Sequence, residues 1–185
     1  SALALNNQDR FHNSRTLFVT GEREEESGNR AGYLSFEPHR CDRRNGKLAK
    51  HIDHWRPVHR WSEQEVWDII KRHGVVPHPA YRLGYSRLSC QNCIFSTKNQ
   101  WATNRMINPQ SFEAIAQYEA EFNCTIHRTM NVREQADQGT AYPAATNNPE
   151  LVAMAMSETY TGEILVDPEN WELPAGAFGE DAGPT

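Results

Sequence analysis

The stretch Gly21-Glu-Arg-Glu-Glu-Glu-Ser-Gly-Asn-Arg-Ala31 directly follows Thr16-Leu-Phe-Val-Thr20, a short run of β-branched and aromatic residues. Such a run predicts a buried parallel strand, and the glycine after it predicts a turn at the carboxyl end of that strand. In open α/β sheets, ligands bind at the carboxyl ends of the strands. We therefore expect residues 21–31, called the arginine loop below, to lie at a binding site.

Two arginines dominate this loop. Arg23 and Arg30 offer guanidinium groups to an anionic ligand, while Glu25 can orient them or accept hydrogen bonds from ribose hydroxyls. Ser27 lies between the two arginines. A solvated, charge-rich turn that opens a surface helix is the alternative interpretation of such a run.

The composition of the chain narrows the class of protein. Its 185 residues suffice for one ordinary domain, and its mean hydropathy of -0.76 predicts long polar loops, an extended tail or a surface that something else completes. The net charge of -5 argues against a globally basic nucleic-acid binder and leaves the segment 39–44 as a local basic candidate. Because the sequence has neither an apolar run of membrane length nor a secretory segment, we expect a soluble, cytoplasmic protein.

The chain has four cysteines, and two of them form a Cys-x-x-Cys pair, Cys90 and Cys93. In a cytosolic chain this spacing favours metal or redox chemistry over structural disulfides. With Cys41 and Cys124 as completing ligands, four thiolates would satisfy either an iron-sulfur cluster or zinc. A reduced or zinc-stapled turn is the alternative for the pair, and a buried apolar side chain is the alternative for each of the other two.

Local patterns predict the secondary structure elsewhere. A capping box at Ser62-Glu-Gln-Glu65 opens a helix that runs to Arg72, with Gly74 as its C-cap. Apolar spacing after Pro109 predicts a second helix ending near Asn123. The remaining expectations are a loop or loose hairpin over 31–50, an extended passage over 51–61, a short helix over 150–157 and a tail over 167–185.

Several short motifs occur in the order found in the phosphoadenosine phosphosulfate (PAPS) reductase family. They are Gly21-x-Arg-x-Glu-x-Ser-x-x-Arg-Ala31, Trp55-Arg-Pro57, Trp61-Ser-x-x-Glu-Val-Trp67, His78-Pro-x-Tyr81, Gly84-Tyr85 and Cys90-x-x-Cys93. Over roughly residues 15–125 the chain resembles this family, within the wider adenine nucleotide α-hydrolase group. Its Cys-x-x-Cys makes it similar to the branch of DNA phosphorothioation sulfurtransferases.

The resemblance implies a Rossmann-like parallel sheet with flanking helices and an adenine nucleotide (ATP, APS or PAPS) at the strand carboxyl ends. It implies catalytic roles for Arg23, Glu25 and Arg30, with Ser27 beside them at the phosphate or sulfate end of the substrate. The other candidate binding residues are Trp55, which can stack on a base, His78, which adjoins a family motif, and Arg87, which can meet the sulfate or the charge of a cluster. The alternatives are a core tryptophan at position 55, a hydrogen-bonding loop histidine at 78 and a surface arginine at 87. His54 is a further candidate site neighbour.

Two departures from the family shape the interpretation. The chain lacks the Ser-Gly-Gly-Lys-Asp-Ser type loop that cradles phosphate, so we expect the N-terminal half of the fold to come from the same gene or from a second chain. Residues 1–130 would then be the second half of an α/β domain, and 131–185 a family-specific extension and tail. The chain also lacks an adjacent cysteine pair and a terminal cysteine, which argues against thiol attack on PAPS.

The sequence therefore predicts an enzyme of sulfur or adenylyl chemistry, an oxidoreductase or a sulfurtransferase, that uses an iron-sulfur cluster or a metal. The alternative is a non-catalytic, zinc-stapled module that binds nucleic acid or a partner carrying the missing half. Formation of a homodimer is a further expectation, and no contact with membranes is expected. A tRNA-thiolating enzyme would require a strongly basic surface, which this composition does not supply.

Overall fold

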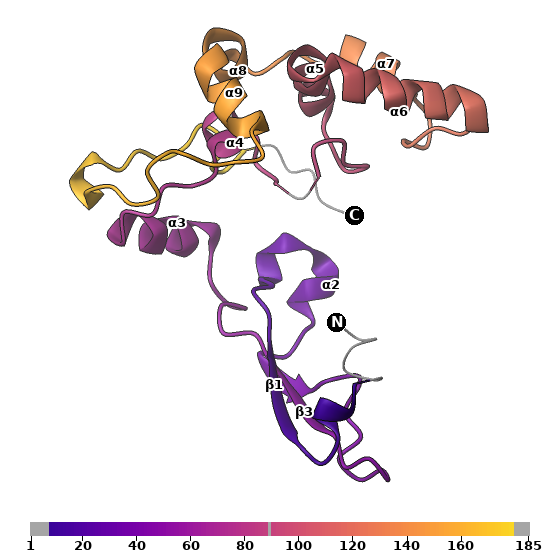
Figure 1. The fold of residues 1–185 in the computed structure, drawn as a ribbon, viewed down its shortest axis with the longest axis vertical. Coiled ribbons are helices and arrows are strands. Elements are labelled where there is room, and N and C mark those ends of the chain that lie inside the picture. The colour runs from indigo at the N-terminus through magenta and orange to yellow at the C-terminus, as the bar shows by residue number, and fades with distance from the viewer. Residues whose placement is uncertain (1–7, 89, 180–185) are drawn as a thin grey trace. The chain divides into compact units, whose positions relative to one another are not determined.

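The computed structural model describes residues 8–88 and 90–179, and the chain divides into two compact units (Figure 1). The first unit ends at Val66 and the second begins at Trp67. Each unit is described by itself. The prediction of a boundary near residue 130, which rested on the family resemblance, stays a prediction.

The first unit is built on a three-stranded sheet in the order β1-β3-β2. β1 pairs with β3 in parallel, with Val19 opposite Trp55, and β2 pairs antiparallel with the other side of β3. The described elements of this unit are η1 (Asp9–Phe11), β1 (Arg15–Val19), η2 (Glu24–Glu26), α2 (Gly28–Ala31), β2 (Phe36–Pro38), β3 (His51–Trp55) and the start of α3 (Glu63–Arg72).

The two faces of this sheet differ. On one face Ile52 and Cys41 are buried in a small core with Phe11 and Phe18 packed against it. On the other face four large apolar side chains are 43% to 56% exposed: Leu17, Val19, Phe36 and Trp55. The sheet therefore has one packed face and one exposed apolar face.

The second unit is helical. Its described elements are the rest of α3, α4 (Pro79–Arg82), α5 (Lys98–Ile107), α6 (Pro109–Phe122), α7 (Val132–Asp137), α8 (Pro143–Asn147), α9 (Pro149–Met156) and η3 (Pro168–Asn170). One core cluster joins α5, α6 and α7 through Trp101, Phe112 and Val132. A second cluster contains Leu83 and Leu151 and joins α4, α8 and α9.

The predicted ends of two helices, α3 and α6, are confirmed by their capping residues. Ser62 and Glu65 form the reciprocal hydrogen bonds of a capping box at the start of α3, and Gly74 follows it with a φ of 60°. An added Cβ at Gly74 would lie 1.9 Å from the carbonyl oxygen of Val166, so only glycine fits there. α6 ends at Asn123, whose left-handed backbone makes it the C-cap.

The sequence patterns did not predict α5, although it is the most buried helix that the structure describes. Its buried residues include Gln100, Thr103 and Asn104, whose polarity hides the apolar periodicity on which helix prediction depends. Asn104 is satisfied by the Tyr85 hydroxyl, which donates to its Oδ1 at 2.6 Å, and by the Gln91 carbonyl, which accepts from its Nδ2 at 2.5 Å. Burial also raises the pKa of Tyr85.

The chain is thus a mixed α/β protein with a small sheet that contains a parallel pair. This arrangement is consistent with a Rossmann-like domain. Within the described residues, we find no helix both long and apolar enough to cross a bilayer. The C-terminal tail runs through η3, and its residues 180–185 lie outside the described part of the chain.

Candidate functional site

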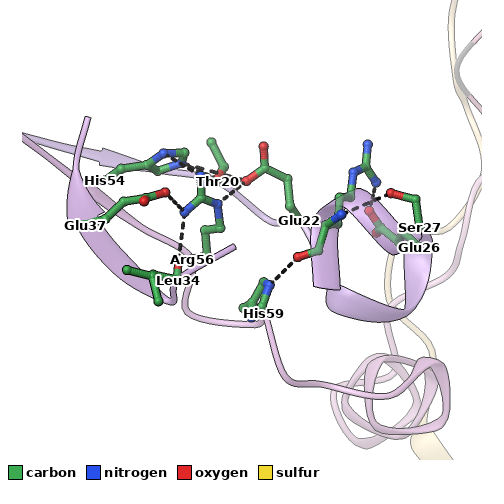
Figure 2. A network of polar contacts seen from close by, with 10 residues as sticks. Thr20, Glu22, Glu26, Ser27, Leu34, Glu37, His54, Arg56 and His59 are labelled. Atoms are coloured by element: carbon green, nitrogen blue, oxygen red, sulfur yellow. Dashed lines mark hydrogen bonds and ion pairs between the residues drawn. The ribbon is translucent and has the colours of Figure 1, made fainter. Parts of the chain in front are cut away.

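A polar network lies just beyond the carboxyl ends of β1 and β3, and Arg56 is its centre (Figure 2). The Arg56 guanidinium donates to Glu22 at 2.7 Å, to Glu37 at 2.6 Å and to the Leu34 carbonyl at 2.8 Å. Its remaining terminal nitrogen lies 3.0 Å from Nδ1 of His54. Arg56 is only 5% exposed, so its charge is balanced almost entirely by protein groups.

The contact with Arg56 determines the tautomer of His54. Since a guanidinium can only donate, Nδ1 of His54 must accept, and the ring proton of the neutral imidazole is on Nε2. Nε2 then donates to the Thr20 hydroxyl at 2.7 Å, and this hydroxyl donates to Glu22 at 2.7 Å. The result is a directed chain of hydrogen bonds from Arg56 through His54 and Thr20 to Glu22.

The pKa shifts agree with this chain of donors and acceptors. Burial, followed by the charge of Arg56, lowers the pKa of His54, which keeps the ring neutral. Burial acts to raise the pKa of Glu22, but the hydrogen bonds from Thr20 and Arg56 outweigh it and lower that pKa. His39, whose ring packs against Phe18 and His54, also has a lowered pKa because it is buried.

The arginine loop is held by its own carboxylates. Arg23 donates to Glu25 at 2.9 Å and to the Trp61 carbonyl at 3.2 Å, and Arg30 forms an ion pair with Glu26. The Ser27 hydroxyl is the N-cap of α2 and accepts from the Arg30 amide at 3.3 Å. The Arg23 side chain is 15% exposed and that of Arg30 is 39% exposed, so Arg30 is the more accessible of the two to a ligand.

Two contacts join the arginine loop to the segment after β3. Glu25 accepts from the backbone amide of Glu63 at 2.9 Å, so the same carboxylate serves Arg23 and the start of α3. The buried ring of His59 lies 2.9 Å from the Arg30 carbonyl through Nε2. The arginine loop is therefore held by contacts with residues 59 and 63 as well as by its own ion pairs.

The other predicted site residues divide between the units. Trp55 lies at the end of β3 in the first unit, 43% exposed on the open face of the sheet. His78, Arg87 and Cys90 belong to the second unit, where all three line one cavity of about 550 Å³. The prediction that the arginine loop faces Cys90 and Cys93 stays a prediction.

The cysteines differ in their surroundings. Cys41 is buried in the core of the first unit, in line with the alternative of a small apolar residue. Cys90 and Cys124 are exposed and Cys93 is half-buried. No three histidine, cysteine or acidic side chains come together as a metal-binding group anywhere in residues 8–88 or 90–179.

Sequence reasoning missed the members of the Arg56 network other than His54. The signals were present: Arg56 lies within the Trp55-Arg-Pro57 motif, and Glu22 lies two residues after Thr20 at the end of the first strand. Glu37 carried no signal, because only the pairing of β2 with β3 brings it beside Arg56.

Comparison with known proteins places this geometry in context. Residues 7–96, just under half of the chain, match the model of the phosphoadenosine phosphosulfate reductase domain. The adenosine 5′-phosphosulfate reductase of Allochromatium vinosum is 34% identical over 79 residues, which are 43% of this chain and 28% of that protein. The corresponding reductase of Neisseria meningitidis serogroup A is 31% identical over 90 residues, 49% of this chain and 34% of that protein.

An uncharacterized 37.8 kDa protein from the gpa 5′ region of Escherichia phage 186 is 34% identical over 65 residues, 35% of this chain and 20% of the phage protein. The matched segments thus span between a fifth and about a third of the length of these curated relatives. No solved structure matches the chain significantly.

Proposed function

We propose that the protein acts in sulfur-nucleotide chemistry, as an oxidoreductase or sulfurtransferase that binds an adenine nucleotide such as APS, PAPS or ATP. The observation that carries this proposal is the family match over residues 7–96. That segment contains β1, the arginine loop at its carboxyl end, the Arg56 network and the Cys90-x-x-Cys93 pair. Two relatives that match 43% and 49% of the chain are named adenosine 5′-phosphosulfate reductases.

The arginine loop is the proposed site for the phosphate or sulfate end of the nucleotide. Arg30 is the accessible guanidinium, and an incoming anion would compete with Glu26 for it. Arg23 would add positive charge at a position that Glu25 and the Trp61 carbonyl hold in place. Arg56 would act through the loop, because it fixes Glu22 immediately before Arg23.

The phosphate-binding half of the fold is a second part of the proposal. The sequence lacks the Ser-Gly-Gly-Lys-Asp-Ser type loop, and we propose that an N-terminal half, from the same gene or another chain, contributes it. The open apolar face formed by Leu17, Val19, Phe36 and Trp55 supports this idea, since it is suited to packing against further elements of an α/β domain.

A cysteine-bound metal is the third part of the proposal. Cys90 and Cys93 would hold an iron-sulfur cluster or zinc, with the remaining ligands from elsewhere, and Cys41 is too buried in its own core to be an evident third. When bound, a cluster would supply redox or electrostatic assistance and zinc a structural staple. Iron and zinc contents of the protein purified without oxygen distinguish the two.

Nucleotide binding tests the main proposal. Calorimetric titration of the natural full-length protein with APS, PAPS, ATP and AMP should show that a sulfonucleotide or ATP binds more tightly than AMP. Arg30→Gln should weaken that binding by about tenfold, the value of one charge-assisted contact. Arg15→Gln, which removes an exposed arginine at the amino end of β1, should have no effect. Wild-type affinity in both Arg30→Gln and Arg23→Gln would overturn the assignment of the loop.

The second candidate is a non-catalytic module that binds a partner, a second copy of the chain or nucleic acid. The specific observation in its favour is the same open apolar face, which gives a surface for a protein partner. Release of sulfite from APS or PAPS in the presence of a thiol reductant separates the two candidates. The enzyme proposal requires this release or transfer of sulfur to an acceptor, whereas the binding module predicts neither.

A further inference from the structure

A basic surface lies at the amino ends of the parallel strands, at the end of the sheet opposite to the arginine loop. Residues 8–15 lead into β1 and residues 39–50 lead into β3, so the two segments meet at this end, which we call the basic end (Figure 1). A hydrogen bond joins them, from the Asn13 amide to the Leu48 carbonyl at 2.9 Å. The two segments therefore form one continuous surface of the first unit.

The charge of the basic end is opposite to that of the whole chain. Its 20 residues include seven of the 19 lysines and arginines and two of the 24 aspartates and glutamates, in a chain with a net charge of -5. The cations are Arg10, Arg15, Arg40, Arg43, Arg44, Lys47 and Lys50. When positive charge gathers at one end of a negative protein, a polyanion is attracted to that end and repelled by the rest.

The carboxylates near the basic end are occupied by Arg44. Asp42 accepts from Nε of Arg44 at 2.8 Å and from the Ile52 amide at 2.8 Å. Asp53 in β3 accepts from a terminal nitrogen of the same guanidinium at 2.7 Å. One arginine thus balances both acids, so they do not cancel the charges of the other cations on the turn between β2 and β3.

Three exposed cations remain on that turn. Arg40, Arg43 and Lys47 are exposed, and none of them forms an ion pair with a carboxylate of the described residues. Arg43 donates to the carbonyls of Arg40 and Asp42, contacts that hold its side chain without cancelling its charge. The Gly46 amide closes the turn by donating to the Arg43 carbonyl at 2.9 Å. The cations are therefore presented on a hydrogen-bonded backbone.

The apolar content of the basic end distinguishes between polyanions. Leu48, which is 43% exposed, is the one large apolar side chain that is exposed in these two described segments. Because binding to a bilayer scales with the apolar area that is buried, one leucine favours a membrane little. Phe11 packs against the core beneath Arg10, so the two segments offer no open phenylalanine, tyrosine or tryptophan ring for base stacking. Contacts with the phosphates of a duplex require only cations.

We propose that the basic end binds the phosphate backbone of a double-stranded nucleic acid. Arg40, Arg43 and Lys47 would contact phosphates, and Arg10 and Arg15 would add positive charge beside them. β1 and β3 have five residues each, about 3.3 Å apart, so this surface lies on the order of 15 Å from the arginine loop. It uses no residue of the proposed nucleotide site, and it would hold a duplex whether or not that site binds a nucleotide.

Fluorescence anisotropy of labelled duplexes tests the proposal on the natural full-length protein. DNA and RNA duplexes of about 20 base pairs, each in two base compositions, should bind with dissociation constants of roughly 1–100 µM at physiological salt. The two compositions should bind alike, because phosphate contacts carry no sequence information. The slope of log K against log salt should be about -3, since each phosphate contact contributes about -0.9. Tighter binding of the DNA or the RNA duplex supports the proposal and identifies the kind of nucleic acid.

Charge variants locate the contacts. Arg40→Gln, Arg43→Gln and Lys47→Gln combined should weaken duplex binding at low salt at least about tenfold and reduce the magnitude of the salt slope by about 2–3. Arg40→Gln with Lys47→Gln, which leaves the Arg43 contacts intact, should give an intermediate loss. Arg40→Lys with Arg43→Lys keeps both charges and should retain most of the affinity.

A second triple variant controls for net charge. Arg60→Gln, Lys71→Gln and Arg72→Gln combined removes the same charge from exposed positions outside the basic end and should weaken the duplex by less than about threefold. Equal affinity of the two triple variants would overturn the proposal. So would the absence of duplex binding below about 100 µM at low salt, or binding to phosphatidylserine vesicles without binding to either duplex.

Comparison with Arg30→Gln separates this surface from the proposed nucleotide site. Arg30→Gln should leave duplex binding within about twofold of wild type, because the arginine loop lies at the other end of the sheet. The triple variant of the basic end should in turn bind adenine nucleotides as the wild type does. A loss of duplex binding in Arg30→Gln as large as that in the basic-end triple variant would place the duplex on the arginine loop and overturn the proposal.

Discussion

Arg56 in the first unit and Arg87 in the second have opposite surroundings. Arg56 is 5% exposed and its guanidinium contacts two carboxylates, a carbonyl and a histidine ring nitrogen. Arg87 is half-buried beside a cavity of about 550 Å³ that is lined mainly by apolar side chains. The difference shows that an arginine in a family motif can serve the fold, while an arginine outside such a motif can border an open cavity.

The largest expected effect on stability comes from removing the charge of Arg56 from its network. Arg56→Met should lower the free energy of unfolding by roughly 2–4 kcal/mol, because Glu22 and Glu37 are left close together without their shared cation. Urea denaturation followed by circular dichroism measures this change. Arg15→Gln, at an exposed position at the start of β1, is the matched variant and should change stability by less than about 0.5 kcal/mol. Equal losses in the two variants would contradict the structural role of Arg56.

A smaller effect is expected when one carboxylate of the network is neutralised. Glu22→Gln should cost about 1–2 kcal/mol at neutral pH, because hydrogen bonds from Thr20 and Arg56 lose a charged acceptor. The pKa of Glu22 is lowered by folding, so its contribution is present above the ordinary value of 4.5 and is lost as the pH falls through the folded value. Denaturation from pH 7 to pH 3 should therefore show a weaker acid dependence in the variant than in the wild type.

The pH dependence contributed by His54 should be weaker still. Burial and Arg56 lower its pKa, so the unfolded state binds the proton more readily than the folded state does. The contribution of the neutral His54 ring to stability is fully present above about pH 6.5, its ordinary pKa. This contribution declines as the pH falls from there towards the pKa of His54 in the folded protein. His54→Gln should flatten this decline, and His39 contributes to the remainder in the same direction. An unchanged slope between pH 7 and pH 5 in His54→Gln would argue against a neutral His54 in the folded protein.

The smallest change in stability is expected at the open cavity. Ala155→Leu should alter the melting temperature by no more than about 2 °C, because the larger side chain enters empty space. Ala136→Leu provides the contrast: Ala136 is 1% exposed in a packed core, and a larger residue there should cost about 1–3 kcal/mol. A loss of the same size in both variants would mean that the cavity is filled in solution.

The predictions made from the sequence were accurate for elements whose signals lie within a few residues. The strand before the arginine loop, the capping box of α3 and the end of α6 near Asn123 all belong to this class. The prediction that this strand is buried was wrong, because Leu17 is 52% exposed and Val19 is 51% exposed. α5 was missed because its buried face contains Thr103 and Asn104, which bond to distant groups instead of following an apolar pattern. β2 was missed because Phe36–Pro38 is too short and too polar to be distinguished from a loop.

The same contrast applies to the candidate residues. Arg23, Glu25, Ser27 and Arg30 could be selected because they share one short segment, and the structure gives each of them a partner close to or within that segment. His78, Arg87 and Cys90 were selected separately, for different reasons, and the packing of α4, α5 and α9 brings all three to one cavity. The sequence did not predict the cavity, because several of the residues that line it also pack in a core cluster. It also did not predict that the described lining residues include no carboxylate.

The sequence by itself determined where the chain turns, where its best-signalled helices begin and end, and which motifs relate it to sulfonucleotide enzymes. Those properties depend on backbone preferences and on side chains a few residues apart. Only the tertiary structure decided that Arg56 is neutralised by Glu22, 34 residues away, and by Glu37, 19 residues away. Long-range pairing of this kind depends on which strands lie side by side, and no local preference of Arg56 specifies that.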